Sequence, residues 1–283
     1  MKRIILVLMC VFYAVNAGDK KEKANCCATT ATEEFAAFGK SMAFVSLHEA
    51  PEPFEFISSG GEMKTIKTSD SMDARMFVVR SPQASNNYIL LFHEWWGLND
   101  YIKQEAQKIR RDIGNVTVIA VDLYDGKIAT SPDSARAYVG QVNEVRARTI
   151  INAAIEYAGT KAKIATLGWC FGGGWSMQSA LMLGKQAVGC VIYYGMPEKD
   201  VKKLSTLQCD VLGIFGSQDK FINPAVVAAF EKNMKEAKKK LEVKMYDADH
   251  AFANPSNPHH DKAMTADANA ATVTYLRSKF VQP

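Results

Sequence analysis

From residue 54 to the C-terminus, segments typical of β-strands alternate with segments typical of α-helices. Short apolar runs such as NYILLFHE (87–94) and NVTVIAVDLY (115–124) predict buried strands. The longer amphipathic run YIKQEAQKIRRDI (101–113) predicts a helix between them. Such alternation implies a mainly parallel sheet with helices on both faces, because a parallel connection needs a crossover and a helix supplies it. With 283 residues, 48% of them apolar, the chain can bury such a sheet in one domain.

The rest of this region follows the same pattern. Pro224 suits the first turn of one predicted helix, where its missing N–H costs nothing. No internal repeat and no linker divides the region, so we expect a single domain over 54–283. We expect further strands at 73–80, 161–170, 187–195, 209–217 and 241–248, and further helices at 142–159, directly after Cys170, at 223–237 and at 261–280.

The N-terminus has the layout of a secretory signal peptide. Lys2 and Arg3 precede an apolar run over residues 4–15, and small Ala17 ends a cleavage-type sequence. The run is too short to span a bilayer comfortably, so an uncleaved anchor is the weaker alternative. We therefore expect a signal peptide over 1–17, cleavage after Ala17, and a periplasmic or secreted protein without a membrane segment.

Residues 18–53 are predicted to form a polar tail followed by a short helix. Thr30 and Glu33 have the spacing of a capping box, and Phe35, Phe38, Met42 and Val45 follow at helical spacing. Two prolines within EAPEPF (49–54) end this helix, which we expect to pack on the main domain. His48, just before them, is a lone histidine without an evident partner.

The cysteine content does not indicate a disulfide framework. After removal of the leader five cysteines remain, an odd number, so at least one thiol is free or pairs between chains. Cys26 and Cys27 are adjacent in the polar tail, while Cys190 and Cys209 lie in apolar runs and are interpreted as small buried hydrophobes. Cys170 stands apart because of its glycine-rich setting.

Chemically active side chains follow five of the predicted strands. They are Glu94, Tyr124, Cys170, Asp219 and His250. Because functional residues of open parallel sheets collect at the carboxyl ends of strands, we expect these side chains to meet at one edge.

Cys170 occupies the turn GWCFGG between a predicted strand and a predicted helix. Gly168 and Gly172 would clear space in a turn too sharp for larger side chains, and the helix N-terminus would favour a thiolate. The order nucleophile, acid, histidine, here Cys170, Asp219 and His250, is that of α/β-hydrolases. A Gly-flanked cysteine could also belong to a dinucleotide-type turn, but the G-x-G-x-x-G spacing is missing.

Several stretches together resemble the dienelactone hydrolase family. They are LLFHEWWGLNDYIK, AVDLYDG, GWCFGGGWS, YYG, GSQDKFINP and DADHAFANP, and the resemblance extends from about residue 54 to 280. It implies an α/β-hydrolase fold, a mainly parallel sheet with helices on both faces. It also implies a Cys-His-Asp triad that cleaves enol-lactones or related esters.

By this resemblance Cys170 is the nucleophile, His250 the base and Asp219 its orienter. Glu94 corresponds to a family glutamate that contacts the nucleophile thiol and helps to activate it when substrate arrives. The backbone N–H groups of Trp95 and Phe171 would be the oxyanion donors.

Three further residues are expected to bind substrate. Trp95 and Trp96 are placed at the pocket mouth, where they would be either a substrate wall or plain packing, and Tyr124 follows a neighbouring strand. Asn254 stands where dienelactone-cleaving members carry an arginine for the substrate carboxylate. The sequence therefore predicts the hydrolytic machinery but does not identify the ester.

Other functions are less compatible with the sequence. A redox role for Cys170 lacks a C-x-x-C motif or a resolving cysteine, and an idle fold that only binds ligand would not need an intact triad. The net charge of +4 and the short lysine runs do not form a nucleic-acid footprint. His259, His260 and Asp261 resemble metal ligands but better fit a polar helix start. We expect no cofactor, no metal, a small ester or lactone as the partner, and a monomer.

Overall fold

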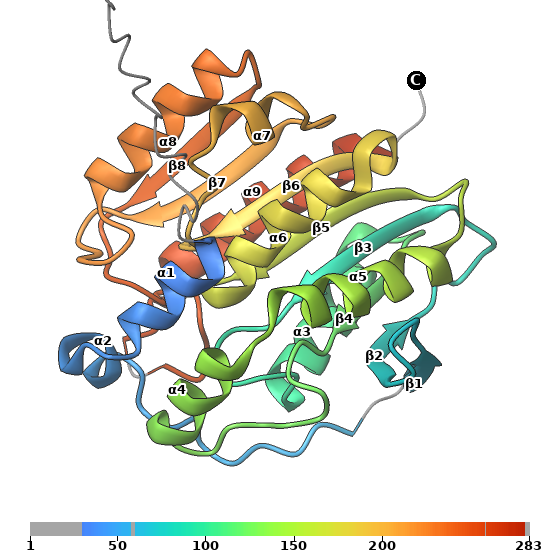
Figure 1. Cartoon of the computed structure of the whole chain (residues 1–283), viewed down its shortest axis with the longest axis horizontal. Helices are drawn as coiled ribbons and strands as arrows, with labels where there is room; N and C mark the ends of the chain where they lie inside the picture. Colours follow the sequence, from blue (N-terminus) through green and yellow to red (C-terminus); the bar gives the residue numbers. More distant parts are fainter. Residues whose placement is uncertain (1–29, 58–59, 258, 281–283) are drawn as a thin grey trace, which may run out of the picture.

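The computed structural model describes residues 30–57, 60–257 and 259–280, and its centre is one eight-stranded sheet (Figure 1). The strand order is β1-β2-β4-β3-β5-β6-β7-β8. β1 pairs antiparallel with β2, and β2 pairs antiparallel with β4, while every later pair is parallel. The strands are β1 (Gly61–Lys67), β2 (Asp73–Val79), β3 (Asn87–Phe92), β4 (Thr117–Val121), β5 (Lys163–Trp169), β6 (Ala187–Tyr193), β7 (Val211–Gly216) and β8 (Leu241–Tyr246).

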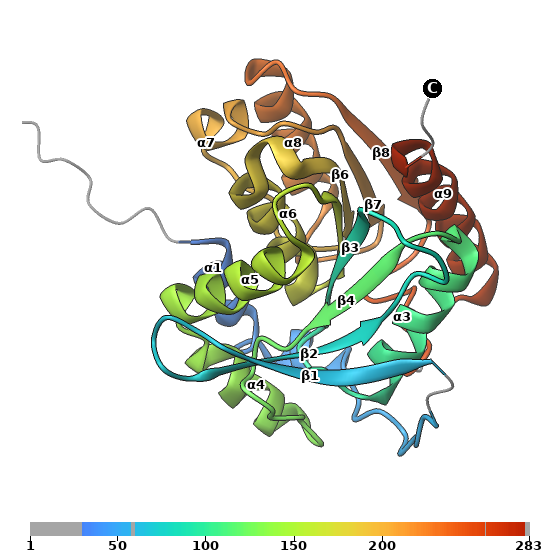
Figure 2. The ribbon, with the colours of Figure 1, turned by 90° about the vertical axis from the view of Figure 1, so that its right-hand side faces the viewer.

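Helices cover both faces of this sheet, as the alternation predicts (Figure 2). On one face α3 (Asp100–Ile113) packs against β4 and against α9 (Lys262–Phe280). On the other face α6 (Phe171–Leu183) lies across β5, β6 and β3, and α5 (Glu144–Ala158) lies against β2 and β4. The interior strands β4 and β7 are buried along their whole length, which explains why their sequences are continuous apolar runs. The remaining helices are α1 (Ala31–Phe38), α2 (Met42–Ser46), α4 (Pro132–Gln141), α7 (Val201–Ser205) and α8 (Pro224–Glu236), with a 3-10 turn at Gly184–Gln186.

The expected N-terminal helix is in fact two helices. The Thr30–Glu33 capping box is present at the start of α1, but α1 ends at Gly39 and α2 begins after Ser41. Glycine favours the break because it loses more backbone entropy in a helix than other residues. The break turns Met42 outward, where it is 75% exposed, instead of inward as its helical spacing predicted.

Other elements were missed because their local signals are weak. β1 is a half-exposed edge strand of mixed charged and apolar residues, and α4 and α7 are short. Cys209, predicted within a strand, precedes β7 and is only partly buried, whereas Cys190 is fully buried in β6. The predicted signal peptide and the Cys26–Cys27 pair lie outside the described residues.

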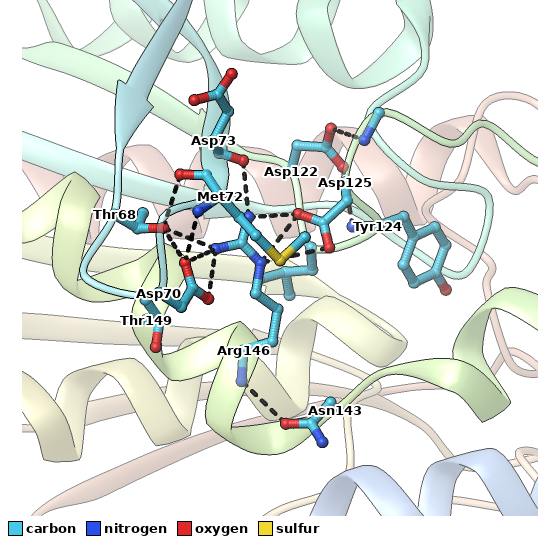
Figure 3. A network of polar contacts seen from close by, with 12 residues as sticks. Thr68, Asp70, Met72, Asp73, Asp122, Tyr124, Asp125, Asn143, Arg146 and Thr149 are labelled. Atoms are coloured by element: carbon cyan, nitrogen blue, oxygen red, sulfur yellow. Dashed lines mark hydrogen bonds and ion pairs between the residues drawn. The ribbon is translucent and has the colours of Figure 1, made fainter.

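Arg146 joins three separate segments on the α5 side of the sheet (Figure 3). Its guanidinium pairs with Asp70 at 3.0 Å and with Asp125 at 2.6 Å. It also donates to the hydroxyl of Thr68 and to the backbone carbonyl of Asp73. The contact fixes the β1–β2 turn against the loop that follows β4.

Candidate active site

Cys170 occupies a strained turn between β5 and α6. Its φ is 57° and ψ −120°, a conformation that non-glycine residues rarely adopt. A Cβ on Gly168 would lie 2.0 Å from the carbonyl oxygen of Gly172, and one on Gly172 would lie 2.3 Å from that of Phe92. These are backbone atoms that cannot move aside, so the turn requires glycine on both sides of the cysteine. The structure thus confirms the steric role predicted for the two glycines.

The turn brings Cys170 within reach of two residues from other strands. Its Sγ lies 3.3 Å from Nε2 of His250, which follows β8. Nδ1 of the same ring lies 2.7 Å from Oδ2 of Asp219, which follows β7. A carboxylate can only accept here, so His250 donates from Nδ1, and the neutral form of the ring presents a lone pair on Nε2 to the thiol. The three residues predicted to cooperate are therefore connected in series.

Burial and neighbouring charge set the proton affinities of this series. Burial raises the pKa of the Cys170 thiol, and nearby His250 opposes that rise. Burial lowers the pKa of His250, but the charges of Asp219 and Cys170 outweigh it and raise that pKa well above its usual value. Burial also raises the pKa of Asp219, but His250 and two backbone donors, Phe221 and Ile222, outweigh it and lower that pKa. Proton transfer from the thiol to Nε2 is thereby favoured by the carboxylate behind the ring.

Glu94 is buried beside the series but makes different contacts from those expected. Its carboxylate accepts hydrogen bonds from Asn254 Nδ2 at 2.5 Å and from the Tyr194 hydroxyl at 3.4 Å. Among the described residues no hydrogen bond joins this carboxylate to the thiol, and Cys170 Sγ instead faces His250. Glu94 still acts on the thiol through its charge, which raises the pKa of Cys170. Burial in turn raises the pKa of Glu94 to about 7.

Next to Glu94 is a cavity of about 180 Å³. Two of the three predicted substrate-binding residues, Trp96 and Asn254, line it. Tyr124 lines a different cavity, and its hydroxyl donates to the backbone carbonyl of Trp95. The cavity is lined by Glu94, Trp96, Gly97, Asn99, Tyr101, Ile102, Glu105, Trp169, Ala253, Asn254, Pro255, Ser256, His260, Thr265 and Asn269.

Of the two predicted oxyanion donors, Phe171 directly follows the nucleophile in the chain, whereas Trp95 comes from the loop after β3. Phe171 is the first residue of α6, where a backbone N–H has no partner within the helix, and this N–H favours the thiolate form of Cys170. Trp95 follows Glu94 and is fully buried, with its ring against His48 and Trp96 rather than at a pocket mouth.

Residues 30–57, which we call the N-terminal cap, cover the thiol. In the cap, α1 lies against α4 and α6 (Figure 1). Phe44 of α2 is fully buried, and its ring lies 5.5 Å from that of His250. His48 places Nε2 4.0 Å from Cys170 Sγ. Cys170 and Phe44 are 0% exposed, and His250 and His48 are each 1% exposed, so the cap seals the reactive atoms from solvent.

The interpretation of His48 as a histidine without a partner is wrong. Its Nδ1 donates to the Phe44 carbonyl oxygen at 2.8 Å, and its ring packs against Trp95. No local pattern could have shown this, because the contact with Cys170 spans 122 residues of sequence. The regular spacing of Phe35 and Phe38 indicated only that this segment packs somewhere.

The remaining candidates have structural roles. Asp261 caps α9 by accepting from the backbone N–H of Met264 at 2.8 Å, as the helix-start interpretation predicted. His93 is buried and accepts from the backbone N–H of Leu123.

The strand order and the positions of the three residues define the class of protein. A turn of the nucleophile type follows β5, the acid follows β7 and the histidine follows β8. This arrangement is that of an α/β-hydrolase.

The dienelactone hydrolase family model matches residues 73–280, so the chain belongs to that family of hydrolases. A candidate carboxymethylenebutenolidase of Aquifex aeolicus is 27% identical over 213 residues, which cover 71% of this chain and 91% of that protein. The carboxymethylenebutenolidase of a Pseudomonas species is 29% identical over 132 residues, covering 45% of this chain and 54% of the relative.

Solved structures share the fold. A candidate dienelactone hydrolase of Klebsiella pneumoniae superposes with a TM-score of 0.67 at 18% identity, covering 76% of this chain and 97% of that one. A dienelactone hydrolase-like promiscuous phosphotriesterase from metagenomic libraries gives 0.65 at 19% identity, covering 79% and 100%. Within residues 30–57, 60–257 and 259–280, no helix combines the length and apolar character that crossing a membrane requires.

Proposed function

We propose that this protein is an exported thiol hydrolase of small carboxylic esters or lactones, which acts through Cys170, His250 and Asp219. The observation that supports it most directly is the connected series of 3.3 Å from thiol to imidazole and 2.7 Å from imidazole to carboxylate. The names of the relatives agree with this substrate class, because a butenolide is an unsaturated lactone.

In the proposed reaction the Cys170 sulfur attacks the ester carbonyl carbon while its proton passes to Nε2 of His250. The negative charge that develops on the carbonyl oxygen is stabilised by the backbone N–H groups of Trp95 and Phe171. Collapse of this intermediate releases the alcohol, which takes the proton from His250, and leaves a thioester. Water, deprotonated by His250, then releases the acid and restores the thiol.

Glu94 and Asn254 are proposed to shape the substrate pocket. Asn254 donates one amide hydrogen to Glu94 and supplies neutral polar groups where an arginine would supply a positive charge. The site is therefore suited to a neutral ester more than to a substrate with a free carboxylate. Arg136, an arginine whose side chain lies beside Gly39 of the N-terminal cap, pairs with Asp133 at the surface instead of supplying that charge.

Export rests on the charged start, the apolar run and Ala17 in the sequence. The proposed mature protein begins at Gly18 and acts as a monomer in the periplasm or outside the cell. N-terminal sequencing of the exported protein tests this, and a mature chain that retains Met1 in a membrane fraction contradicts it.

Turnover of chromogenic short-chain esters and lactones tests the activity. Cys170→Ala should abolish hydrolysis in a folded protein, since no acyl-enzyme can form, and Cys170→Ser should leave weak activity at best. Cys209→Ala is the matched control, because Cys209 is also a free thiol but lies outside the site. Undiminished turnover in Cys170→Ala refutes the assignment, and peroxide consumption without hydrolysis in the unaltered protein would instead indicate a redox thiol.

A further inference from the structure

We propose that His48, Cys170 and His250 form a site for one zinc-class transition-metal ion, which holds the N-terminal cap closed over the thiol. Ion binding itself depends only on the geometry of these three side chains. Inhibition by the ion rests in addition on the proposed function, in which Cys170 is the nucleophile.

The ligand atoms already lie close to the spacing of a tetrahedral site. Cys170 Sγ is 3.3 Å from Nε2 of His250 and 4.0 Å from Nε2 of His48, and all three atoms lie within 4.8 Å of one another. Zinc bonds of about 2.3 Å to sulfur and 2.0–2.1 Å to nitrogen place tetrahedral neighbours about 3.4–3.6 Å apart. The two contacts to sulfur are within a few tenths of an ångström of these values. The two Nε2 atoms lie within 4.8 Å of each other, and their approach would complete three ligands and leave the fourth position to water.

Both histidines are oriented as metal-bound histidines are. His48 donates its Nδ1–H to the backbone carbonyl of Phe44, and His250 donates its Nδ1–H to Asp219. In its neutral form each ring therefore carries its lone pair on Nε2, the atom that faces the sulfur. A carboxylate or carbonyl behind the ring is the usual outer partner that fixes the tautomer and strengthens the ligand.

The charges of the site suit a divalent cation. Metal binding forms the metal–sulfur bond as the thiol proton leaves to solvent. The ion with its thiolate then carries one positive charge, and the buried carboxylate of Asp219 stands directly behind one ligand.

His48 distinguishes this site from the hydrolytic machinery. It comes from the N-terminal cap, whereas Cys170 and His250 come from the sheet, so the ion would connect two parts of the chain that otherwise meet mainly through apolar rings. A thiolate held by the ion cannot attack an ester. The bound state would be a closed and inactive form of the enzyme, reversible by a chelator.

Cobalt(II) titration of the full chain tests ion binding without reference to hydrolysis. The unaltered protein should bind one ion with a thiolate-to-cobalt absorption band in the near ultraviolet and the visible bands of tetrahedral cobalt. Cys170→Ala should lose the thiolate band. His48→Asn keeps an N–H for the Phe44 carbonyl but removes the Nε2 ligand, and it should weaken binding by more than about 100-fold, beyond the usual cost of an outer-partner substitution. His259→Asn, an exposed histidine elsewhere in the chain, is the matched control and should bind as the unaltered protein does.

Zinc inhibition of ester turnover, measured relative to each variant's own metal-free rate, gives the second readout. EDTA should restore the unaltered enzyme, and His48→Asn should need correspondingly more zinc for half-inhibition. Absence of cobalt binding, or equal binding by His48→Asn and the unaltered protein, overturns the site. If cobalt binds as described but no ester is turned over, the metal site stands and the proposed function fails.

Discussion

Phe44→Ala should greatly increase the reactivity of the Cys170 thiol with iodoacetamide. The Phe44 ring is fully buried in the N-terminal cap, and it contacts the rings of Phe221 at 4.9 Å and Trp95 at 5.4 Å outside the cap. Truncating a buried phenylalanine to alanine costs about 3–5 kcal/mol through lost transfer energy and the cavity left behind. Those contacts exist only while the cap is docked, so the cost should fall on docking.

The size of the effect follows from the opening equilibrium. If the thiol reacts only when the cap has moved away, its labelling rate is proportional to the open population. At about 1.36 kcal/mol per tenfold change, the loss of Phe44 raises that population roughly 150- to 5,000-fold. The assay follows alkylation of the Cys170 peptide by mass spectrometry, which separates it from the other cysteines.

Met42→Ala is the matched control, because Met42 belongs to the same short helix but is 75% exposed. Its labelling rate should stay within roughly threefold of the unaltered protein, as for an ordinary surface substitution. An unchanged labelling rate in folded Phe44→Ala would show that reagents reach the thiol by another route, such as the cavity beside Glu94.

Three further outcomes follow from the site. Gly172→Ala should prevent folding or destabilise the protein severely, because its Cβ would lie 2.3 Å from the Phe92 carbonyl oxygen. The control is Gly140→Ala, which has open space around it inside α4. It should raise the free energy of unfolding, measured in urea, by roughly 0.5–1 kcal/mol. Burial raises the folded-state pKa of Glu94 from 4.5 to about 7. The free energy of unfolding should therefore fall by about 3 kcal/mol as the pH rises through that window. Glu94→Gln should unfold at a higher urea concentration than the unaltered protein at pH 8, and the difference should vanish near pH 4. His250→Ala should lower kcat roughly 10⁶-fold and Asp219→Ala only roughly 10⁴-fold, because the base remains in the second variant. If both variants keep the kcat of the unaltered protein, Cys170, His250 and Asp219 do not act together in catalysis.

Local sequence patterns predicted the elements that carry the chemistry. The predicted ends of the strands β3, β5 and β7 agree with the observed ends to within two residues. Burial on both faces of the sheet requires an uninterrupted apolar sequence, which is easily recognised. The glycines around Cys170 also predicted its turn, because sterics there depend on neighbours in the chain.

Contacts made across the fold were predicted less well. Tyr124 and Glu94 were placed beside the right strands, but their partners are set by packing between loops, which no local pattern encodes. His48 was missed for the same reason, since its relation to Cys170 arises only when the N-terminal cap docks. Edge strand β1 escaped prediction because exposure leaves its sequence mixed.

The two edges of the sheet have a consequence for behaviour at high concentration. β1 carries Glu62 and Lys64 on one edge, and β8 carries Glu242 and Lys244 on the other. A flat apolar edge would recruit the edge of a second molecule and extend the sheet from one chain to the next, whereas charged side chains on both borders repel such growth. Concentrated solutions of this protein should therefore resist fibrillar association through strand addition, with added salt weakening that resistance by screening the charges.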